Sequence, residues 1–277
     1  MILLRLTAMT AETIVFAKRL EAESGHEICC IVDERTRVVD TQPFQKISLT
    51  AESCQELGLH TPPDFGWRCG DYGFYLARKR FPAESHLWMI EYDVRITGHN
   101  LKDFFAKFDA EPSYDLIAGD YRPVTDWWYW SHTMVAKGQP VYRCLFPVVR
   151  LSARAIDLLL AQRIRYARYR ARLANWPNDE SFVATVLTQA GMKCADLNEF
   201  GTALWDDHTF SFAKPFDGDT LDTDISSIRV YHPVLYGNDL SRKLERMKVI
   251  AASESYYERQ KRRFIKLVNS RTPAPEA

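Results

Sequence analysis

Several common signatures are missing from this 277-residue sequence. Its six cysteines include no C-x-x-C pair, which argues against a thiol redox motif or a zinc site built on such pairs. The patterns G-x-x-x-x-G-K-[ST], G-x-G-x-x-G and G-x-S-x-G are also absent. The usual forms of P-loop enzymes, dinucleotide-binding enzymes and α/β-hydrolases are therefore excluded.

An excess of charge of one sign is missing as well, because 36 Lys and Arg residues balance 36 Asp and Glu residues. A neutral chain has no overall field that would draw it onto nucleic acid. No apolar run approaches the roughly 18 residues that a membrane helix needs, and residues 1–6 are too short for a secretory signal. We therefore expect reduced cysteines, a cytoplasmic location and no nucleic-acid partner.

The sequence does contain the alternation of elements that is typical of an α/β protein. Residues 2–6 and 27–32 are predicted strands, and Thr10 caps the helix predicted between them. A β-α-β opening indicates a parallel sheet covered by helices. Later helices are predicted over residues 68–80, 101–108, 152–174, 178–190 and 239–269. Later strands are predicted over 88–94, 114–118, 141–151, 194–197 and 228–231, with loops over 40–66 and 200–224.

Two carboxylates stand one residue apart at the end of the strand predicted over Trp88–Val94. On a strand, Glu91 and Asp93 would share one face and Tyr92 would point to the other. Ligands of open α/β sheets bind outside the carboxyl ends of the strands, and paired acids there suit a divalent cation that carries phosphate oxygens. The alternative is a solvated strand end on which two acids share a face by chance.

A second acidic pair opens a predicted helix in the stretch Asn178-Asp179-Glu180. The free N–H groups of a first helical turn stabilise a carboxylate as the anion, which keeps it ready to accept a proton. The alternative is that Asn178 caps the helix and the two acids only favour its dipole.

A histidine follows the late strand predicted over residues 228–231. The neutral imidazole of His232 is an acceptable ligand for Mn²⁺, and a hydrogen-bonded structural role is the alternative. His208, in a stretch rich in aspartate, is the competing candidate.

In the order of these features the chain resembles the nucleotide-sugar glycosyltransferases of the GT-A fold. The pair Glu91-x-Asp93 is similar to the D-x-D motif of that family, in which two acids hold Mg²⁺ or Mn²⁺ against the diphosphate of the donor. A Glu replaces the first Asp here. The resemblance implies a GT-A-like, Rossmann-like fold with a mostly parallel central sheet over residues 1–235, followed by a basic helix and tail over 236–277. It implies the metal ligands Glu91, Asp93 and His232, and the catalytic acids Asp179 and Glu180, with Asp179 as general base.

Contacts with the nucleotide are expected at strand ends and helix starts. Asp33 ends the second predicted strand, where an acid commonly contacts a base or ribose, although a turn-forming role is an alternative. The resemblance adds Arg68 on the diphosphate, Asp71 on the sugar or ribose, and Tyr92. Gly70 would permit a close approach at the helix start, and a capping turn explains residues 67–72 equally well.

The implied activity is metal-assisted transfer of a sugar from a nucleotide-diphosphate donor to a glycan or lipid-linked acceptor, as in polysaccharide biosynthesis. Inversion is expected if Asp179 is the base. One alternative is a sugar nucleotidyltransferase, which would normally carry a Gly-rich loop where residues 6–10 have no glycine. The other is a non-catalytic sugar-binding or scaffold protein of envelope polysaccharide assembly.

Two further groups of residues concern the acceptor and its location. The aromatic cluster Trp127–Trp130 could stack on sugar rings, or it could pack against the sheet. Cations gather on two predicted helices, where they could bind the inner face of an anionic membrane or form solvated faces. They are Arg163, Arg165, Arg168, Arg170 and Arg172 on the first, and Arg259, Lys261, Arg262, Arg263 and Lys266 on the second.

Overall fold

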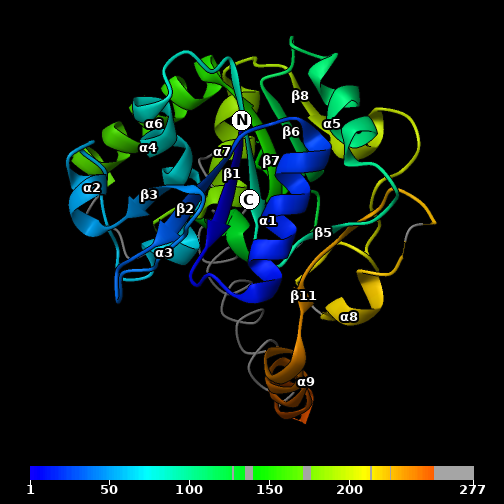
Figure 1. Ribbon diagram of the computed structural model, residues 1–277. Coiled ribbons are helices and arrows are strands. Elements are labelled where there is room, and N and C mark those ends of the chain that lie inside the picture. Colours follow the sequence, from blue (N-terminus) through cyan, green and yellow to red (C-terminus); the bar gives the residue numbers. More distant parts are fainter. Residues whose placement is uncertain (127, 135–139, 171–175, 213, 225, 253–277) are drawn as a thin grey trace, which may run out of the picture.

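The computed structural model of the chain describes residues 1–126, 128–134, 140–170, 176–212, 214–224 and 226–252. Its centre is a seven-stranded sheet (Figure 1). The strands follow one another across this sheet as β3 (Gln45–Leu49), β2 (Ile28–Asp33), β1 (Ile2–Leu6), β4 (His86–Glu91), β7 (Tyr142–Ser152), β6 (Leu116–Pro123) and β8 (Cys194–Asp196). The first four are parallel, β7 is antiparallel to both of its neighbours, and β6 and β8 are parallel. The predicted α/β fold with a mostly parallel central sheet flanked by helices is confirmed.

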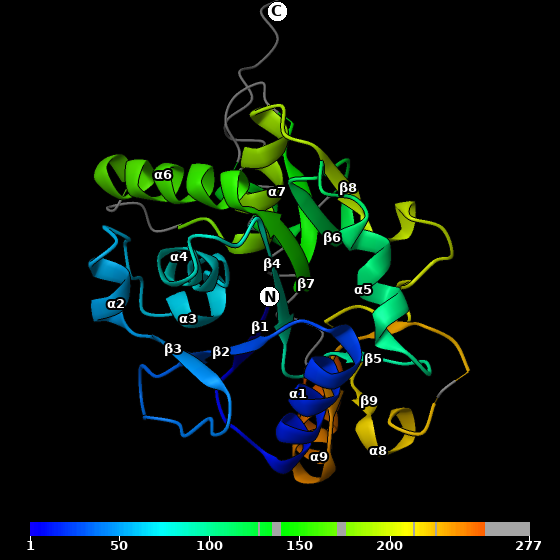
Figure 2. The same ribbon diagram turned by 45° about the horizontal axis from the view of Figure 1, so that its top comes forward.

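Helices cover both faces of the sheet, as Figure 2 shows. One face packs against α2 (Ala51–Gln55), α4 (Asp71–Arg80), α6 (Ala153–Arg170) and α7 (Asp179–Gln189). The other face packs against α1 (Ala11–Ser24) and α5 (Leu101–Asp109). Strands buried on both faces must be apolar throughout. Strand β1 follows this rule, because Leu3 joins the first core and its neighbours Ile2 and Leu4 join the second.

The helix starts predicted from capping residues are confirmed. The side chain of Thr10 accepts a hydrogen bond from the backbone N–H of Thr13 at the start of α1, and the hydroxyl of Ser152 accepts one from Ala155 at the start of α6. Asn178 caps α7 by accepting from the N–H of Ser181. Each cap satisfies a donor that the first helical turn leaves free.

Some predictions about local structure were wrong, among them the loop expected over residues 200–224, which contains β9 (Phe216–Asp217) and α8 (Gly218–Leu221). The stretch expected to be a loop over residues 40–66 contains β3, α2 and the start of α3 (Phe65–Arg68). Strand β4 ends at Glu91 rather than at residue 94, so Asp93 lies in a turn. That turn is closed by a 3.1 Å hydrogen bond from the N–H of Val94 to the carbonyl of Glu91. The two acids therefore meet through a turn and not through the alternation of a strand.

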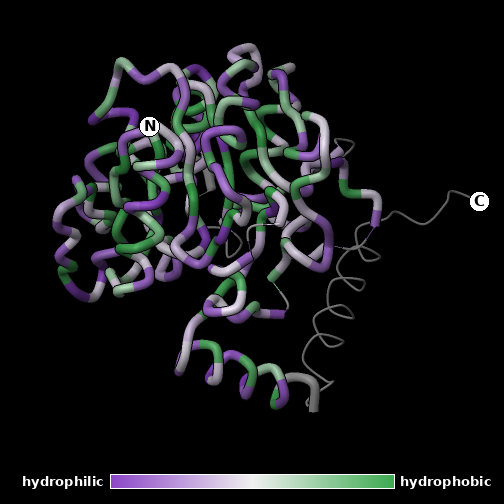
Figure 3. The backbone as a smooth tube through the Cα atoms, turned by 45° about the vertical axis from the view of Figure 1, so that its right-hand side comes forward, coloured by the Kyte–Doolittle hydropathy of each residue, from purple (hydrophilic) through white to green (hydrophobic). Residues whose placement is uncertain are grey.

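Short elements connect the sheet to the C-terminal part of the chain. Small two-stranded sheets pair β5 (Arg95–Ile96) with β10 (Val230–Tyr231), and β9 (Phe216–Asp217) with β11 (Val234–Leu235). The remaining elements are η1 (Tyr129–Thr133), η2 (Leu197–Glu199), α8 (Gly218–Leu221) and α9 (Gly237–Ala252). Helix α9 projects from the body with polar and apolar residues interspersed (Figure 3). The pairing of β10 with β5 brings Val230 and Tyr231 back toward the end of β4.

The proposed membrane-binding cations are only partly within the described chain. Arg259, Lys261, Arg262, Arg263 and Lys266 lie outside the described residues, as does Arg172. Arg163 does not belong to an exposed basic face, because its side chain is fully buried against Asp71. Among the described residues, no helix is long and apolar enough to cross a membrane.

Candidate active site

Three potential metal ligands meet just beyond the carboxyl end of β4. Glu91 and Asp93 come from the end of that strand and its turn, and His232 follows β10. One ligand atom from each lies within 4.8 Å of the other two. His232 Nε2 is 3.8 Å from Glu91 Oε2 and 3.7 Å from Asp93 Oδ2. Both distances exceed those of direct hydrogen bonds, so the three atoms face one another across a gap.

The imidazole of His232 is oriented for coordination. Its Nδ1 lies 2.8 Å from the carbonyl oxygen of Ser211. Because a carbonyl oxygen only accepts, Nδ1 carries the proton, and in the neutral ring Nε2 presents its lone pair to the two acids. A backbone carbonyl that holds the second nitrogen in this way is typical of metal-binding histidines. His208, by contrast, is exposed and is not among the three clustered groups.

Asp93 is the member of the trio whose carboxyl group is least well accommodated by its surroundings. Burial raises the pKa of its carboxyl group, the nearby His232 opposes that effect, and Glu91 adds to it. Its Oδ1 atom is buried and has no hydrogen-bond partner among the described residues. A buried carboxylate oxygen without a partner is destabilising, and a bound cation would relieve it. The two oxygens and one nitrogen of the trio fit Mn²⁺ or Mg²⁺.

Arg5 connects this trio to a second group of acids. It is paired with Glu91 in the register of β1 and β4, and its guanidinium forms an ion pair with that carboxylate. The same guanidinium donates to the backbone carbonyls of Gly66 and Trp67 at 2.7 and 3.1 Å. Burial lowers the pKa of Arg5, but the surrounding carboxylates, Glu91 and Asp179 first among them, raise it overall. Arg5 is therefore a fixed cation between the two acidic groups.

Glu91 and Arg5 also line a cavity of about 110 Å³. The start of α7 contributes a polar wall, and four other segments contribute aromatic side chains. The polar lining consists of Arg5, Arg68, Glu91, Asn178, Asp179 and Glu180. The apolar lining consists of Trp67, Trp130, Phe146, Pro147 and Phe212.

Asp179 is held firmly at the start of α7. Its Oδ2 accepts a 2.7 Å hydrogen bond from the N–H of Gly70, and its Oδ1 accepts one of 2.9 Å from the N–H of Glu180. A Cβ at position 70 would lie 2.6 Å from Arg5 Nη1 and 2.7 Å from Asp179 Oδ2, so only glycine fits there. Burial raises the pKa of Asp179 to about 7, against the opposing effect of Arg5. A carboxylate with that pKa is suited to general-base catalysis near neutral pH.

The carboxyl group of Glu180 has fewer hydrogen-bond partners than that of Asp179. The side chain is 4% exposed, and its Oε1 has no hydrogen-bond partner among the described residues. Its other oxygen is 3.4 Å from the amide nitrogen of Asn178. Burial, with Asp179 next to it, raises the pKa of Glu180 well above the ordinary value, although Arg143 opposes this. Burial therefore favours the protonated form of Glu180, in which the carboxyl group can donate a hydrogen bond.

The residues expected to bind the nucleotide lie in different parts of the structure. Arg68 lines the cavity and is held by Asp64 at 2.6 Å. Asp33 lies beside α3 at the end of β2. The guanidinium of Arg35 donates a hydrogen bond to each of its carboxylate oxygens, at 2.8 and 2.7 Å. Tyr92 packs on the core on the α1 side of the sheet. Of these, the structure brings only Arg68 to the cavity.

Asp71 requires a correction. Its carboxylate is fully buried, and Arg163 donates to it at 2.7 and 2.9 Å. The hydroxyl of Tyr75 donates a further hydrogen bond of 2.6 Å. The carboxylate thus joins α4 to α6 in the core and is not available to a sugar or ribose. A buried ion pair with these partners has a structural role.

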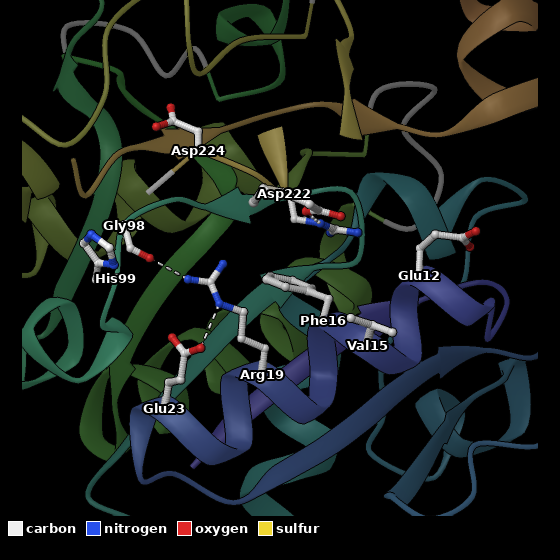
Figure 4. A pocket seen from close by; sticks show the side chains of 10 residues that line it. Glu12, Val15, Phe16, Arg19, Glu23, Gly98, His99, Asp222 and Asp224 are labelled. Atoms are coloured by element: carbon white, nitrogen blue, oxygen red, sulfur yellow. Dashed lines mark hydrogen bonds and ion pairs between the residues drawn. The ribbon is translucent and has the colours of Figure 1, made fainter. Parts of the chain in front are cut away.

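A second and larger cavity lies beside α1 (Figure 4). Its volume is about 280 Å³, and its lining includes four acids and two arginines. Arg19 donates to Glu23 at 3.0 Å and to the carbonyl of Gly98 at 2.7 Å. Arg95 donates to the hydroxyl of Tyr236 at 2.8 Å and lies 3.4 Å from Asp222. These charged groups mainly satisfy one another.

Several members of the first cavity were not predicted as site residues, among them Arg5 and Phe212. In the sequence, Arg5 is a single charged residue within an apolar strand, and such an arginine does not by itself indicate a functional role. Phe212 lies in the expected loop and is 52% exposed, with its ring 5.5 Å from that of His232. Nothing in its local sequence distinguishes it.

Comparisons with known proteins add little to this geometry. No protein-family model matches the sequence, and no curated protein matches it. Among solved structures, the chain is similar to the apo crystal structure of mouse xyloside xylosyltransferase 1, with a TM-score of 0.41 and 12% sequence identity. The similarity covers 85% of this chain and 97% of that chain. A likeness at this level carries no function with it, so the function has to be inferred from the side chains of the site.

Proposed function

We propose that this chain is a metal-dependent glycosyltransferase, which moves a sugar from a nucleotide-diphosphate donor to an acceptor hydroxyl. One observation carries the proposal: Glu91 belongs both to the trio with Asp93 and His232 and to the cavity that Asp179 and Glu180 also line. One cation ligand, Glu91, and a candidate base thus line the same cavity, which adjoins the carboxyl end of β4. This is where ligands bind in open α/β sheets.

The trio would hold Mn²⁺ or Mg²⁺ in this function. When bound, the cation supplies positive charge that offsets the charge developing on the leaving diphosphate. Arg5 and Arg68 add fixed positive charge along the same cavity. Guanidinium groups suit phosphate oxygens because their N–H donors match the geometry of the anion.

Asp179 is the proposed general base. Its carboxylate accepts the proton of the acceptor hydroxyl while that oxygen bonds to the anomeric carbon and the bond from this carbon to the diphosphate oxygen breaks. A base on the face opposite the leaving group gives inversion. Both oxygens of Asp179 accept backbone hydrogen bonds, so the group is oriented in advance, and each oxygen retains a second lone pair.

A thermal-shift panel of nucleoside diphosphates, each with and without Mn²⁺, tests this function. Ligands that bind the native state raise the melting temperature. We expect one nucleotide to stabilise the chain only when Mn²⁺ is present, and Asp93→Asn to abolish that effect. The matching nucleotide sugar should then be turned over. If no nucleotide stabilises the protein in the presence of Mn²⁺, the proposal is wrong.

The non-catalytic alternative is separated from this function by Asp179→Asn. A transferase would lose turnover and keep metal-dependent nucleotide binding, because Asp179 is not one of the three clustered ligands. A sugar-binding or scaffold protein would show no turnover in either form.

A further inference from the structure

Two tryptophans stand together at the edge of the cavity. Trp67 in α3 is 64% exposed, and Trp130 in η1 is half-buried. Their ring centroids are 5.6 Å apart, with the planes tilted by 56°. Large aromatic side chains are usually buried, and exposed ones that line a cavity mark binding surfaces.

The backbone and neighbouring side chains hold this pair in place. The carbonyl of Trp67 accepts a 3.1 Å hydrogen bond from Arg5, which fixes α3 over the end of β1. The guanidinium of Arg68, itself held by Asp64, lies 5.2 Å from the ring centroid of Trp130. The indoles are thus positioned without being buried. Such a surface loses little conformational entropy when a ligand binds.

The position of the pair points to the acceptor rather than the donor. The hydroxyl of Thr133 at the end of η1 lies 2.9 Å from that of Ser181 in the first turn of α7. This contact ties the segment that carries Trp130 to the helix that carries Asp179 and Glu180. An acceptor whose hydroxyl reaches Asp179 therefore lies next to the indoles.

Glu180 supplies a polar counterpart to the aromatic surface. It lines the same cavity, is more than nine-tenths buried, and its Oε1 has no hydrogen-bond partner among the described residues. A ligand hydroxyl would satisfy that atom. Aromatic faces beside an unsatisfied carboxyl group match a sugar ring, which has apolar C–H faces and hydroxyls at its edge.

We propose that Trp67 and Trp130 form an acceptor subsite for a pyranose ring, with a C–H face of the sugar on the indoles and one of its hydroxyls on Glu180. The assignment rests on the proposed function, because it identifies the acceptor of that reaction as a carbohydrate. It makes the sugar ring, rather than a lipid or a protein side chain, the part of the acceptor that the enzyme recognises.

Saturation-transfer NMR on the full chain tests the subsite with simple probes. The probes are the methyl glycosides of glucose, galactose, mannose, xylose and N-acetylglucosamine. We expect at least one to receive saturation on its ring C–H protons. Trp67→Ala and Trp130→Ala should each reduce this transfer to background, and Trp67→Phe should retain part of it. Val38→Ala is the control, since Val38 is 82% exposed and does not line the cavity.

Once turnover is measurable, Trp67→Ala should raise the acceptor KM about tenfold and leave the donor KM unchanged. Saturation that persists in both alanine variants, or that is absent from every glycoside, would overturn the subsite. So would a loss of nucleotide binding in Trp67→Ala with glycoside binding intact, because the indoles would then stack on the base.

The Mn²⁺ and nucleotide thermal shift keeps this failure distinct from failure of the proposed function. A protein that binds nucleotide with Mn²⁺ but shows no tryptophan-dependent sugar contact would keep the transferase and lose the subsite. A protein that shows that sugar contact but no nucleotide binding would keep the subsite and lose the transferase.

Discussion

The cavity beside α1 has more than twice the volume of the cavity between β4 and α7, at about 280 against 110 Å³. Its two arginines are paired with two of its four acids, Arg19 with Glu23 and Arg95 with Asp222. In the smaller cavity Glu180 has a buried oxygen without a described partner, and Asp93 in the adjoining trio has another. Unsatisfied buried groups cost stability, so they are informative about function where volume is not.

The largest effect should come from Asp93→Asn. This change keeps the shape of the side chain and removes the charge that a cation requires, and we expect turnover to fall by about 10³-fold or more. Metal-dependent stabilisation by nucleotide should disappear. The matched change in the other cavity is Asp222→Asn, which should leave turnover unaltered. Equal losses in both variants would remove the distinction between the two cavities.

Asp179→Asn should have the next largest effect. Loss of a general base typically costs 10²–10⁴-fold, and we expect kcat to fall by about 10²–10³-fold with the donor Kd unchanged. Glu23→Gln is the control, because Glu23 is an acid that lines the larger cavity, where it accepts from Arg19. A normal kcat in Asp179→Asn would assign the base to another group.

His232→Gln should weaken Mn²⁺ binding by about 10–100-fold, since it removes the nitrogen ligand and its fixed orientation. The corresponding residue in the larger cavity is His99. Calorimetric titration of Mn²⁺ into His99→Gln should match the unaltered protein. A loss of Mn²⁺ affinity in His99→Gln alone would relocate the metal site.

Part of the candidate site could be predicted from the sequence, and the limits have physical causes. Glu91, Asp93 and His232 could be proposed because paired acids at a strand end suit a divalent cation, and because the order of the predicted elements placed that strand and the late histidine. Asp71, which was expected to contact the sugar or ribose, shows what the sequence does not reveal. Its partner Arg163 is 92 residues away and belongs to a helix that read as a solvated basic face. Pairing across such a distance is a tertiary effect that local pattern does not reveal.

The prediction of a loop over residues 40–66 was wrong for a related reason. Strand β3 lies at the edge of the sheet and has exposed residues at Gln45 and Lys46. An edge strand needs little apolar sequence, so its composition resembles that of a loop. The sequence predicted only part of the aromatic subsite. The cluster of residues 127–130 was recognised, although Trp127 lies outside the described residues. The partner of Trp130 is Trp67, which belongs to a different segment.

The pH dependence of turnover gives a smaller, graded test. The base must be deprotonated, and burial raises the pKa of Asp179 to about 7. Activity should therefore rise with pH through about 7 and fall roughly tenfold for each unit below it. A kcat that is level from pH 5 to 8 would contradict Asp179 as the base.

The smallest effects concern stability. Glu180→Gln removes a carboxyl group whose pKa is raised by burial. A raised acid pKa favours folding at low pH, and this contribution is lost as pH rises through the folded-state value. The gain in melting temperature from Glu180→Gln should therefore be greater at pH 8 than at pH 5. Arg95→Met, which leaves the carbonyls of Tyr92 and Val94 without their donor, should instead cost about 1–3 kcal/mol. Stabilisation by both changes would contradict the contrast between the cavities.

The central claim is that Glu91, Asp93 and His232 bind one divalent cation. Pulsed electron paramagnetic resonance of Mn²⁺ added to the purified chain tests it directly, because a coordinated imidazole nitrogen couples to the manganese spin. We predict one bound Mn²⁺ with a nitrogen coupling that disappears in His232→Gln and survives in His99→Gln. The absence of bound Mn²⁺, or a nitrogen coupling that persists in His232→Gln, would contradict the account.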